Sequence, residues 1–196
     1  MPETVVTGET EAHLKSLEAI LKAASFAAEK HAAQKRKGAA GEPYVNHLLE
    51  VALLVSAALS EPDTNLVMAA LLHDSVEDAG VTQRDLAERF GADVAGLVAE
   101  VTDDKSLPRA ERKRLQIVNA PKKSARAQVI KLADKISNLR AILCSPPADW
   151  SAARRKEYIE WAKQVVDALP APNPILAAEF QQTYRKLAEQ SEVSHG

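Results

Sequence analysis

Four ionisable side chains follow one apolar helical segment, at positions that should point into the protein. The apolar run ends at Leu72, continues with His73 and Asp74, and adds Glu77 and Asp78 one turn later. Successive residues of a helix turn by about 100°, so these four side chains continue the apolar stripe. Burying them without partners would cost several kcal/mol, and a metal ion is an economical partner. Alternatively, the helix emerges into solvent at His73 and the charges are simply exposed.

Two further polar side chains share faces with apolar residues. His47 lies one turn before Val51, and Asp134 occupies the apolar face of a later helix. Taken singly, each could be structural: a histidine bonded to a backbone carbonyl, or an aspartate that caps a helix or pairs with a lysine. Together with His73 and Asp74 they offer two imidazoles and two carboxylates. Such a set suits Mn, Fe, Co, Ni or Zn, and the spacing does not choose among these metals.

The composition favours helices as the scaffold for these residues. Alanine, leucine, valine and isoleucine must form the core, because aromatic residues make up only 4% of the chain. No run alternates as a strand would. We expect Asp63 to cap the helix that begins there. The apolar spacing predicts helices over residues 14–34, 44–58, 63–80, 82–90, 92–101, 125–144, 151–169 and 175–190, with a charged helix or loop over 107–118.

The length predicts a single domain, and the helical spacing predicts that this domain is all-α, built as one helical bundle. The chain has 196 residues, enough for one domain with its own core and no need of disulfides. We place this domain at residues 13–190, between a flexible N-terminal lead-in at 1–12 and a C-terminal tail at 191–196. Apolar residues at 46% and charged residues at 27% exclude a wholly disordered chain.

Charge and cysteine content narrow the classes of partner. A net charge of −2 gives no reason to expect a nucleic acid or a membrane surface. The single cysteine, Cys144, cannot form an internal disulfide, which fits a reducing compartment. The first residues lack the features of a secretory signal, and no apolar run approaches the roughly 18 residues that span a membrane. We therefore expect a cytoplasmic protein.

Four segments, taken in order, resemble one known family. They are KRKGAAGEPYVNH, HDSVED, TDDK and KLADKISNLR. The chain resembles the HD superfamily of metal phosphohydrolases, and within it the Mesh-type small alarmone hydrolases and the hydrolase domain of the Rel/Spo enzymes. This resemblance implies an HD-domain helical bundle with one divalent metal, usually manganese. By resemblance, the metal ligands are His47, His73, Asp74 and Asp134.

The resemblance also implies a reaction. The substrate would be guanosine 3′,5′-bis(diphosphate) (ppGpp) or its pentaphosphate relative (pppGpp), hydrolysed to GDP or GTP and pyrophosphate. Glu77 and Asp78 match the catalytic acidic pair of the family, and the sequence does not decide which of them is the base. The chain is too short to carry a synthetase domain as well, which favours a stand-alone hydrolase.

A strongly anionic substrate requires local positive charge. Residues 105–140 hold 11 of the 25 basic residues and only two acidic ones. By resemblance, Arg36 and Lys37 lie at the nucleotide, where a guanidinium can stack on a base and an ammonium can meet phosphate. We expect the basic run 111–114 to be solvated, and Tyr158 and Trp161 to pack their helix. The expected substrate-binding residues are Arg36, Lys37, Tyr44, Lys105, Lys131, Asn138 and Arg140.

Two other functions remain open at this point. One is an HD phosphatase for another nucleotide, such as the 2′-phosphate of NADPH, an activity of animal Mesh-type members. The other is a non-catalytic nucleotide sensor, which the intact pair Glu77 and Asp78 argues against. The expected partner is a small guanine nucleotide, with no nucleic acid and no membrane. The sequence leaves the oligomeric state open, including a homodimer.

Overall fold

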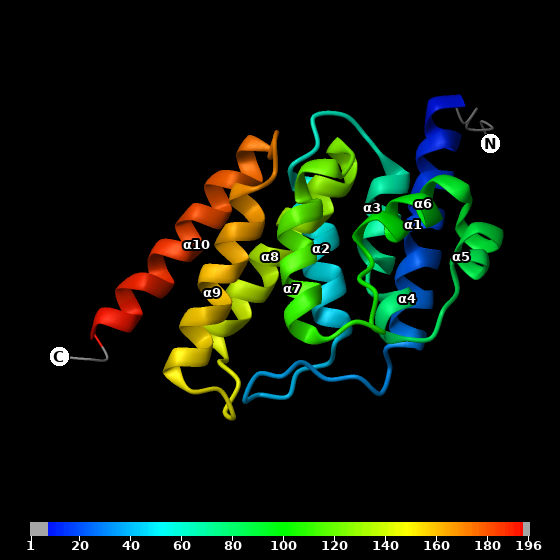
Figure 1. Ribbon diagram of the computed structural model, residues 1–196. Coiled ribbons are helices and arrows are strands. Elements are labelled where there is room, and N and C mark those ends of the chain that lie inside the picture. The colour runs from blue at the N-terminus through cyan, green and yellow to red at the C-terminus, as the bar shows by residue number, and fades with distance from the viewer. Residues whose placement is uncertain (1–7, 194–196) are drawn as a thin grey trace.

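The protein is a bundle of helices. The computed structural model describes residues 8–193, with side chains described to residue 190. Within this range the regular structure is helical, apart from one isolated bridge between Lys35 and Pro43, which confirms the predicted all-α class (Figure 1). The helices are α1 (Gly8–Lys30), α2 (Val45–Ala57), α3 (Thr64–Leu72), α4 (Ser75–Asp78), α5 (Gln83–Phe90), α6 (Ala92–Val101), α7 (Arg109–Asn119), α8 (Ala125–Cys144), α9 (Ala152–Asp167) and α10 (Pro174–Val193), with a 3₁₀ turn at Ala120–Lys122.

Side-chain caps explain where several helices begin. The carboxylate of Asp63 accepts a hydrogen bond from the backbone N–H of Leu66 at 2.9 Å, which confirms the predicted cap of α3. Thr82 and Asp85 form a reciprocal capping box at the start of α5. The hydroxyl of Ser124 accepts a hydrogen bond from the backbone N–H of Ala127 at 3.2 Å and so caps α8. These caps satisfy N–H groups that a helix leaves unpaired at its start.

Helix α8 is the central element of the bundle. It contacts α2, α3, α6, α9 and α10, and its side chains from Ile130 to Ile136 are almost all buried. In Figure 1, α9 and α10 lie on one side of it, and α1, α3, α5 and α6 lie on the other. On that second side α1 packs on α3, and the fully buried residues of α1 are small ones, Ala23 and Ala27. A buried helix of this kind can carry polar side chains precisely placed by packing on every side.

The structure corrects one predicted helix at the point that matters most for chemistry. The sequence predicted a continuous helix over 63–80, but α3 ends at Leu72 and α4 begins at Ser75. Asp74 has φ −98° and ψ −2°, which depart from the values of about −63° and −42° in a regular α-helix. In an unbroken helix, His73 and Asp74 would point about 100° apart. The break lets both side chains point at the same place.

Both ends of the described chain are more helical than predicted. Helix α1 begins at Gly8, within the expected lead-in, and the acidic residues Glu9 and Glu11 favour a helix start there. Helix α10 continues to Val193, into the expected tail. The remaining parts of the lead-in and tail, residues 1–7 and 194–196, lie outside the described range. None of the helices between residues 8 and 193 is long and apolar enough to cross a membrane.

Candidate active site

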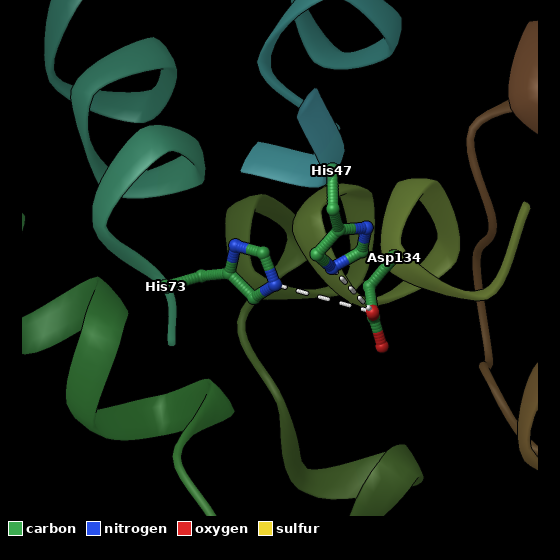
Figure 2. A group of neighbouring side chains, drawn as sticks. All are labelled: His47, His73 and Asp134. Carbon is green, nitrogen blue, oxygen red and sulfur yellow. Dashed lines mark ion pairs between the residues drawn. The ribbon is translucent and has the colours of Figure 1, made fainter. Parts of the chain in front are cut away.

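Two histidines and an aspartate from three different elements meet at the centre of the bundle. His47 comes from the first turn of α2, His73 follows the last residue of α3, and Asp134 lies in the middle of α8 (Figure 2). The Oδ1 atom of Asp134 lies 3.5 Å from Nε2 of His47 and 3.9 Å from Nε2 of His73. One ligand atom of each residue lies within 4.8 Å of the other two, and all three residues are buried.

Asp74 completes this cluster from the break between α3 and α4. Its Oδ2 atom lies 3.2 Å from Nε2 of His73 and 3.6 Å from Nε2 of His47. The phenol of Tyr44 donates a hydrogen bond of 2.5 Å to the same oxygen, which holds the carboxylate in place. The structure therefore brings together all four residues for which the sequence predicted metal binding.

The hydrogen bonding of His73 leaves one ring nitrogen free for a cation. Its Nδ1 lies 2.8 Å from the backbone oxygen of Ala70, which can only accept, so Nδ1 carries a proton. Its Nε2 is buried and makes no hydrogen bond within residues 8–190, although it faces Asp74 and Asp134. This buried nitrogen and the two carboxylates that it faces together form a set of ligand atoms that fits a divalent metal ion.

The pKa shifts within the cluster also indicate that its two carboxylates attract a positive charge. Burial would lower the pKa of His73, but Asp74 and then Asp134 raise that pKa to about 9. Burial would raise the pKa of Asp74, but His73 and His47 hold it well below the usual value for an aspartate. Without a metal, a proton on His73 takes the place of the cation that the two carboxylates attract.

Glu77 and Asp78 lie beside the cluster but in different environments. Glu77 accepts a hydrogen bond of 3.3 Å from the backbone N–H of Asp103, and its Oε1 lies 3.5 Å from Nη1 of Arg112. Burial, followed by the charges of Asp103 and Asp74, raises the pKa of Glu77. Asp78 instead forms an ion pair with Lys105. A glutamate with a raised pKa is better suited to accept a proton than a carboxylate already paired with an ammonium.

An open cavity of about 280 Å³ lies over these acidic residues. Six basic residues line it: Lys37, Arg109, Arg112, Lys113, Lys131 and Lys135. Three aromatic residues line it as well: Tyr44, Tyr158 and Trp161. A cavity lined by carboxylates, cations and aromatic rings suits a phosphorylated nucleotide.

For several of these residues the sequence did not predict a place in the cavity. Arg112 and Lys113 belong to the run predicted to be solvated, and Tyr158 and Trp161 were predicted only to pack their helix. The indole N–H of Trp161 donates to the backbone oxygen of Lys113 at 3.0 Å, and the ammonium of Lys135 lies 4.5 Å from the ring centroid. The i, i+3 spacing of the two aromatic residues was the available signal, since it places both on one face of α9.

The residues predicted to bind substrate fall into two groups. Four of them line the cavity: Lys37, Tyr44, Lys131 and Asn138. The other three do not. Lys105 lies at the rim with Asp78, and Arg36 donates to Ser137 and Asn138. Arg140 forms ion pairs with Glu50 and Glu179, so the structure does not bring it to the cavity.

Comparison with known proteins identifies the family. The HD domain family matches residues 23–163. The chain belongs to the HD domain family. The four residues of the cluster all lie inside the matched range: His47, His73, Asp74 and Asp134. This agrees with the family resemblance stated from the sequence.

Animal proteins of one name are similar to this HD domain over most of their length. The chain is 48% identical over 161 residues to guanosine-3′,5′-bis(diphosphate) 3′-pyrophosphohydrolase MESH1 of Drosophila melanogaster, covering 82% of this chain and 90% of that protein. It is 46% identical over 167 residues to the human protein of the same name, covering 85% and 93%. The solved structure described as a metazoan ortholog of SpoT that hydrolyzes ppGpp matches with a TM-score of 0.82 at 46% identity, covering 86% and 94%.

A close backbone contact holds the loop that precedes α2 in this HD domain. In Figure 1 this loop, residues 31–44, passes along one edge of the bundle near the segment that follows α8. A Cβ atom on Gly38 would lie 2.5 Å from the backbone oxygen of Ser145, closer than real Cβ atoms come. The hydroxyl of Ser145 also accepts a hydrogen bond of 3.1 Å from the backbone of Ala40. Glycine at position 38 therefore lets the loop that carries Lys37 lie against the end of α8.

Gly38→Ala is expected to destabilise the protein by about 1–3 kcal/mol, because the backbone must shift to relieve the overlap. The measurement is the free energy of unfolding from urea denaturation. Gly96→Ala is the matched control, because Gly96 is helical and a Cβ there meets nothing within 4 Å. The control should gain up to about 1 kcal/mol. Equal stability of wild type and Gly38→Ala would show that the loop accommodates the methyl group.

Proposed function

We propose that the chain is a stand-alone hydrolase that converts ppGpp and pppGpp to GDP or GTP and pyrophosphate. The observation that carries this proposal is the cluster of buried His47, His73 and Asp134 with half-buried Asp74, beside a cavity lined by basic and aromatic residues. This arrangement occurs in a chain 46–48% identical to proteins named as 3′-pyrophosphohydrolases of this nucleotide. A hydrolase of this kind needs a site for a metal, a proton acceptor and cationic groups for the phosphates, and the chain has residues suited to each role.

The proposed cofactor is one divalent ion, Mn²⁺, held by the two histidines and the two aspartates. When bound, such an ion lowers the pKa of a coordinated water and offsets the negative charge of a phosphoryl group. The residues fit this role because Nε2 of His73 is buried without a hydrogen bond and faces two carboxylates. Tyr44 orients Asp74, as an outer-shell partner of a ligand does.

Glu77 is the proposed general base for water that attacks the 3′-diphosphate. Its raised pKa and its position one turn after His73 support this role. The nearby guanidinium of Arg112 favours the ionised carboxylate that accepts the proton. Asp78 is the proposed positioning residue of the pair, because it holds Lys105 at the rim of the cavity.

The cations of the cavity are the proposed binding groups for the phosphates. Lys131 is buried, and burial followed by the nearby Lys135 lowers its pKa. An anionic substrate would stabilise the charged form of this ammonium and would gain binding energy from it. Tyr158 and Trp161 are the proposed stacking surfaces for the guanine base, since both line the cavity and their ring centroids lie 5.2 Å apart.

The substrate is tested by comparing turnover of ppGpp and NADPH at equal concentration with Mn²⁺ present. The proposal predicts that ppGpp is the better substrate by kcat/KM and that its products are GDP and pyrophosphate. Preferential release of phosphate from NADPH would instead support the second phosphatase activity. Tight binding of ppGpp without turnover would support a nucleotide sensor.

Binding of Mn²⁺ is expected to be in competition with protons. The metal requires a neutral His73, whose pKa of about 9 in the metal-free protein means that it holds a proton at neutral pH. Below that pKa, the affinity should fall by up to tenfold per pH unit as the pH falls. Calorimetry in two buffers of different ionisation enthalpy measures the released proton directly. An affinity that does not change between about pH 6 and pH 8 would contradict this assignment.

A further inference from the structure

Ser137 occupies the junction of three side chains behind the candidate metal site. It lies on α8, is fully buried, and its hydroxyl oxygen is 2.8 Å from Nδ1 of His47. The same hydroxyl donates a hydrogen bond of 2.6 Å to Oε2 of Glu50. Arg36 donates to it from the other side at 3.3 Å. A helical serine commonly bonds only to its own helix, whereas this one connects residues of α2 and of the preceding loop.

The hydrogen-bonding capacity of these groups determines where the protons lie. A serine hydroxyl has one proton to donate, and the carboxylate of Glu50, which is paired with Arg140, can only accept. The single proton of Ser137 therefore goes to Glu50. It follows that Nδ1 of His47 must donate to the hydroxyl oxygen, as Arg36 does.

In the neutral imidazole, the form that binds a metal, this arrangement leaves Nε2 of His47 with a free lone pair. That nitrogen lies 3.6 Å from Oδ2 of Asp74 and 3.5 Å from Oδ1 of Asp134. A histidine that binds metal through one nitrogen commonly donates its other N–H to a fixed acceptor, which sets the tautomer and the direction of the ring. Ser137 is placed to be that acceptor, and Glu50 is placed to keep its proton turned away from His47.

We propose that Ser137 and Glu50 are positioning residues that hold His47 in the tautomer and orientation needed to bind the metal. This inference rests on the proposed metal site but not on the identity of the substrate. It also gives Arg140 a role away from the cavity, because Arg140 lies 3.1 Å from Oε1 of Glu50 and keeps that carboxylate oriented. Arg36 connects the same junction to Asn138, which donates to Asp134 at 2.6 Å.

The experiment measures Mn²⁺ affinity alone, without nucleotide, from the electron paramagnetic resonance signal of the free ion. Ser137→Ala should weaken binding 10–100-fold, the range typical of an outer-shell partner. Ser137→Thr keeps the hydroxyl and should bind Mn²⁺ nearly as wild type does. Thr183→Val is the control, because it removes a buried hydroxyl that donates to a backbone oxygen of α10. Thermal unfolding of each variant establishes that it is folded.

A double-mutant cycle tests whether Glu50 acts on His47 through Ser137. Glu50→Gln should weaken Mn²⁺ binding when Ser137 is present and should add little in the Ser137→Ala background. Wild-type affinity in folded Ser137→Ala, or an equal effect of Glu50→Gln in both backgrounds, would overturn the inference. If Ser137→Ala does not fold, Glu50→Gln is measured instead in the wild-type and Ser137→Thr backgrounds. If Glu50→Gln then causes no loss of Mn²⁺ affinity in either background, the inference is overturned. A protein that binds Mn²⁺ as expected but leaves ppGpp intact would contradict only the proposed function.

Discussion

Replacing Asp134 by asparagine is expected to remove both metal binding and ppGpp hydrolysis. Asp134, like Asp74, has a carboxylate oxygen within 4 Å of both histidines, and the substitution keeps the shape of the side chain while it removes the charge. We expect Mn²⁺ affinity to fall by at least about 100-fold, beyond the effect of outer-shell partners. His73→Ala should have the same effect, because it removes the buried Nε2 that faces the carboxylates.

This prediction is checked by Mn²⁺ titration and by ppGpp turnover in the same preparation. Asp134→Asn also removes the carboxylate charge that pairs with buried Lys135, so thermal unfolding must show that the variant is folded. Asp167→Asn is the matched control, because Asp167 is an exposed residue of α9 in an ion pair with Lys163. Wild-type metal affinity in folded Asp134→Asn would show that the cluster is not the metal site.

Replacing Glu77 by glutamine is expected to separate metal binding from turnover. Glutamine keeps the size of the side chain and its capacity to accept the backbone hydrogen bond from Asp103, but it cannot take a proton. We expect kcat to fall 10²–10⁴-fold, the range for loss of a general base, while Mn²⁺ affinity changes little. The rate of pyrophosphate release at saturating ppGpp provides the measurement.

Two further variants make the Glu77 result specific. Asp78→Asn should reduce turnover less than Glu77→Gln, because Asp78 is proposed to act through Lys105. Glu88→Gln, on the exposed face of α5, should be neutral. If Glu77→Gln hydrolyses ppGpp at the wild-type rate, Glu77 is not the base, and a larger loss in Asp78→Asn would transfer that role to its neighbour.

The helices and the four clustered residues were predictable because they depend on local pattern. The bounds predicted for α8 agree with the structure at both ends, since Ser124 caps its start and the apolar spacing is regular throughout. Asp134 and His47 stood out as polar residues on apolar faces, and a polar group in such a position needs a partner. That requirement can be recognised in a sequence before the partner is known.

The remaining parts of the site depend on contacts between distant residues. Ser137 and His47 are 90 positions apart, and no local rule indicates that one orients the other. The break at Asp74 was missed because the apolar stripe continues through it, so the periodicity still indicates a helix. Trp161 was assigned to packing because periodicity marks a buried face without telling whether protein or ligand covers it.

Product analysis of ppGpp hydrolysis would show both the reaction of this protein and its dependence on a metal. The purified protein is incubated with ppGpp and either Mn²⁺ or EDTA, and the nucleotides are separated by anion exchange. With Mn²⁺ we expect GDP and one equivalent of pyrophosphate, and with EDTA we expect intact ppGpp. Unchanged ppGpp in both samples, or release of orthophosphate in place of pyrophosphate, would contradict the proposed function.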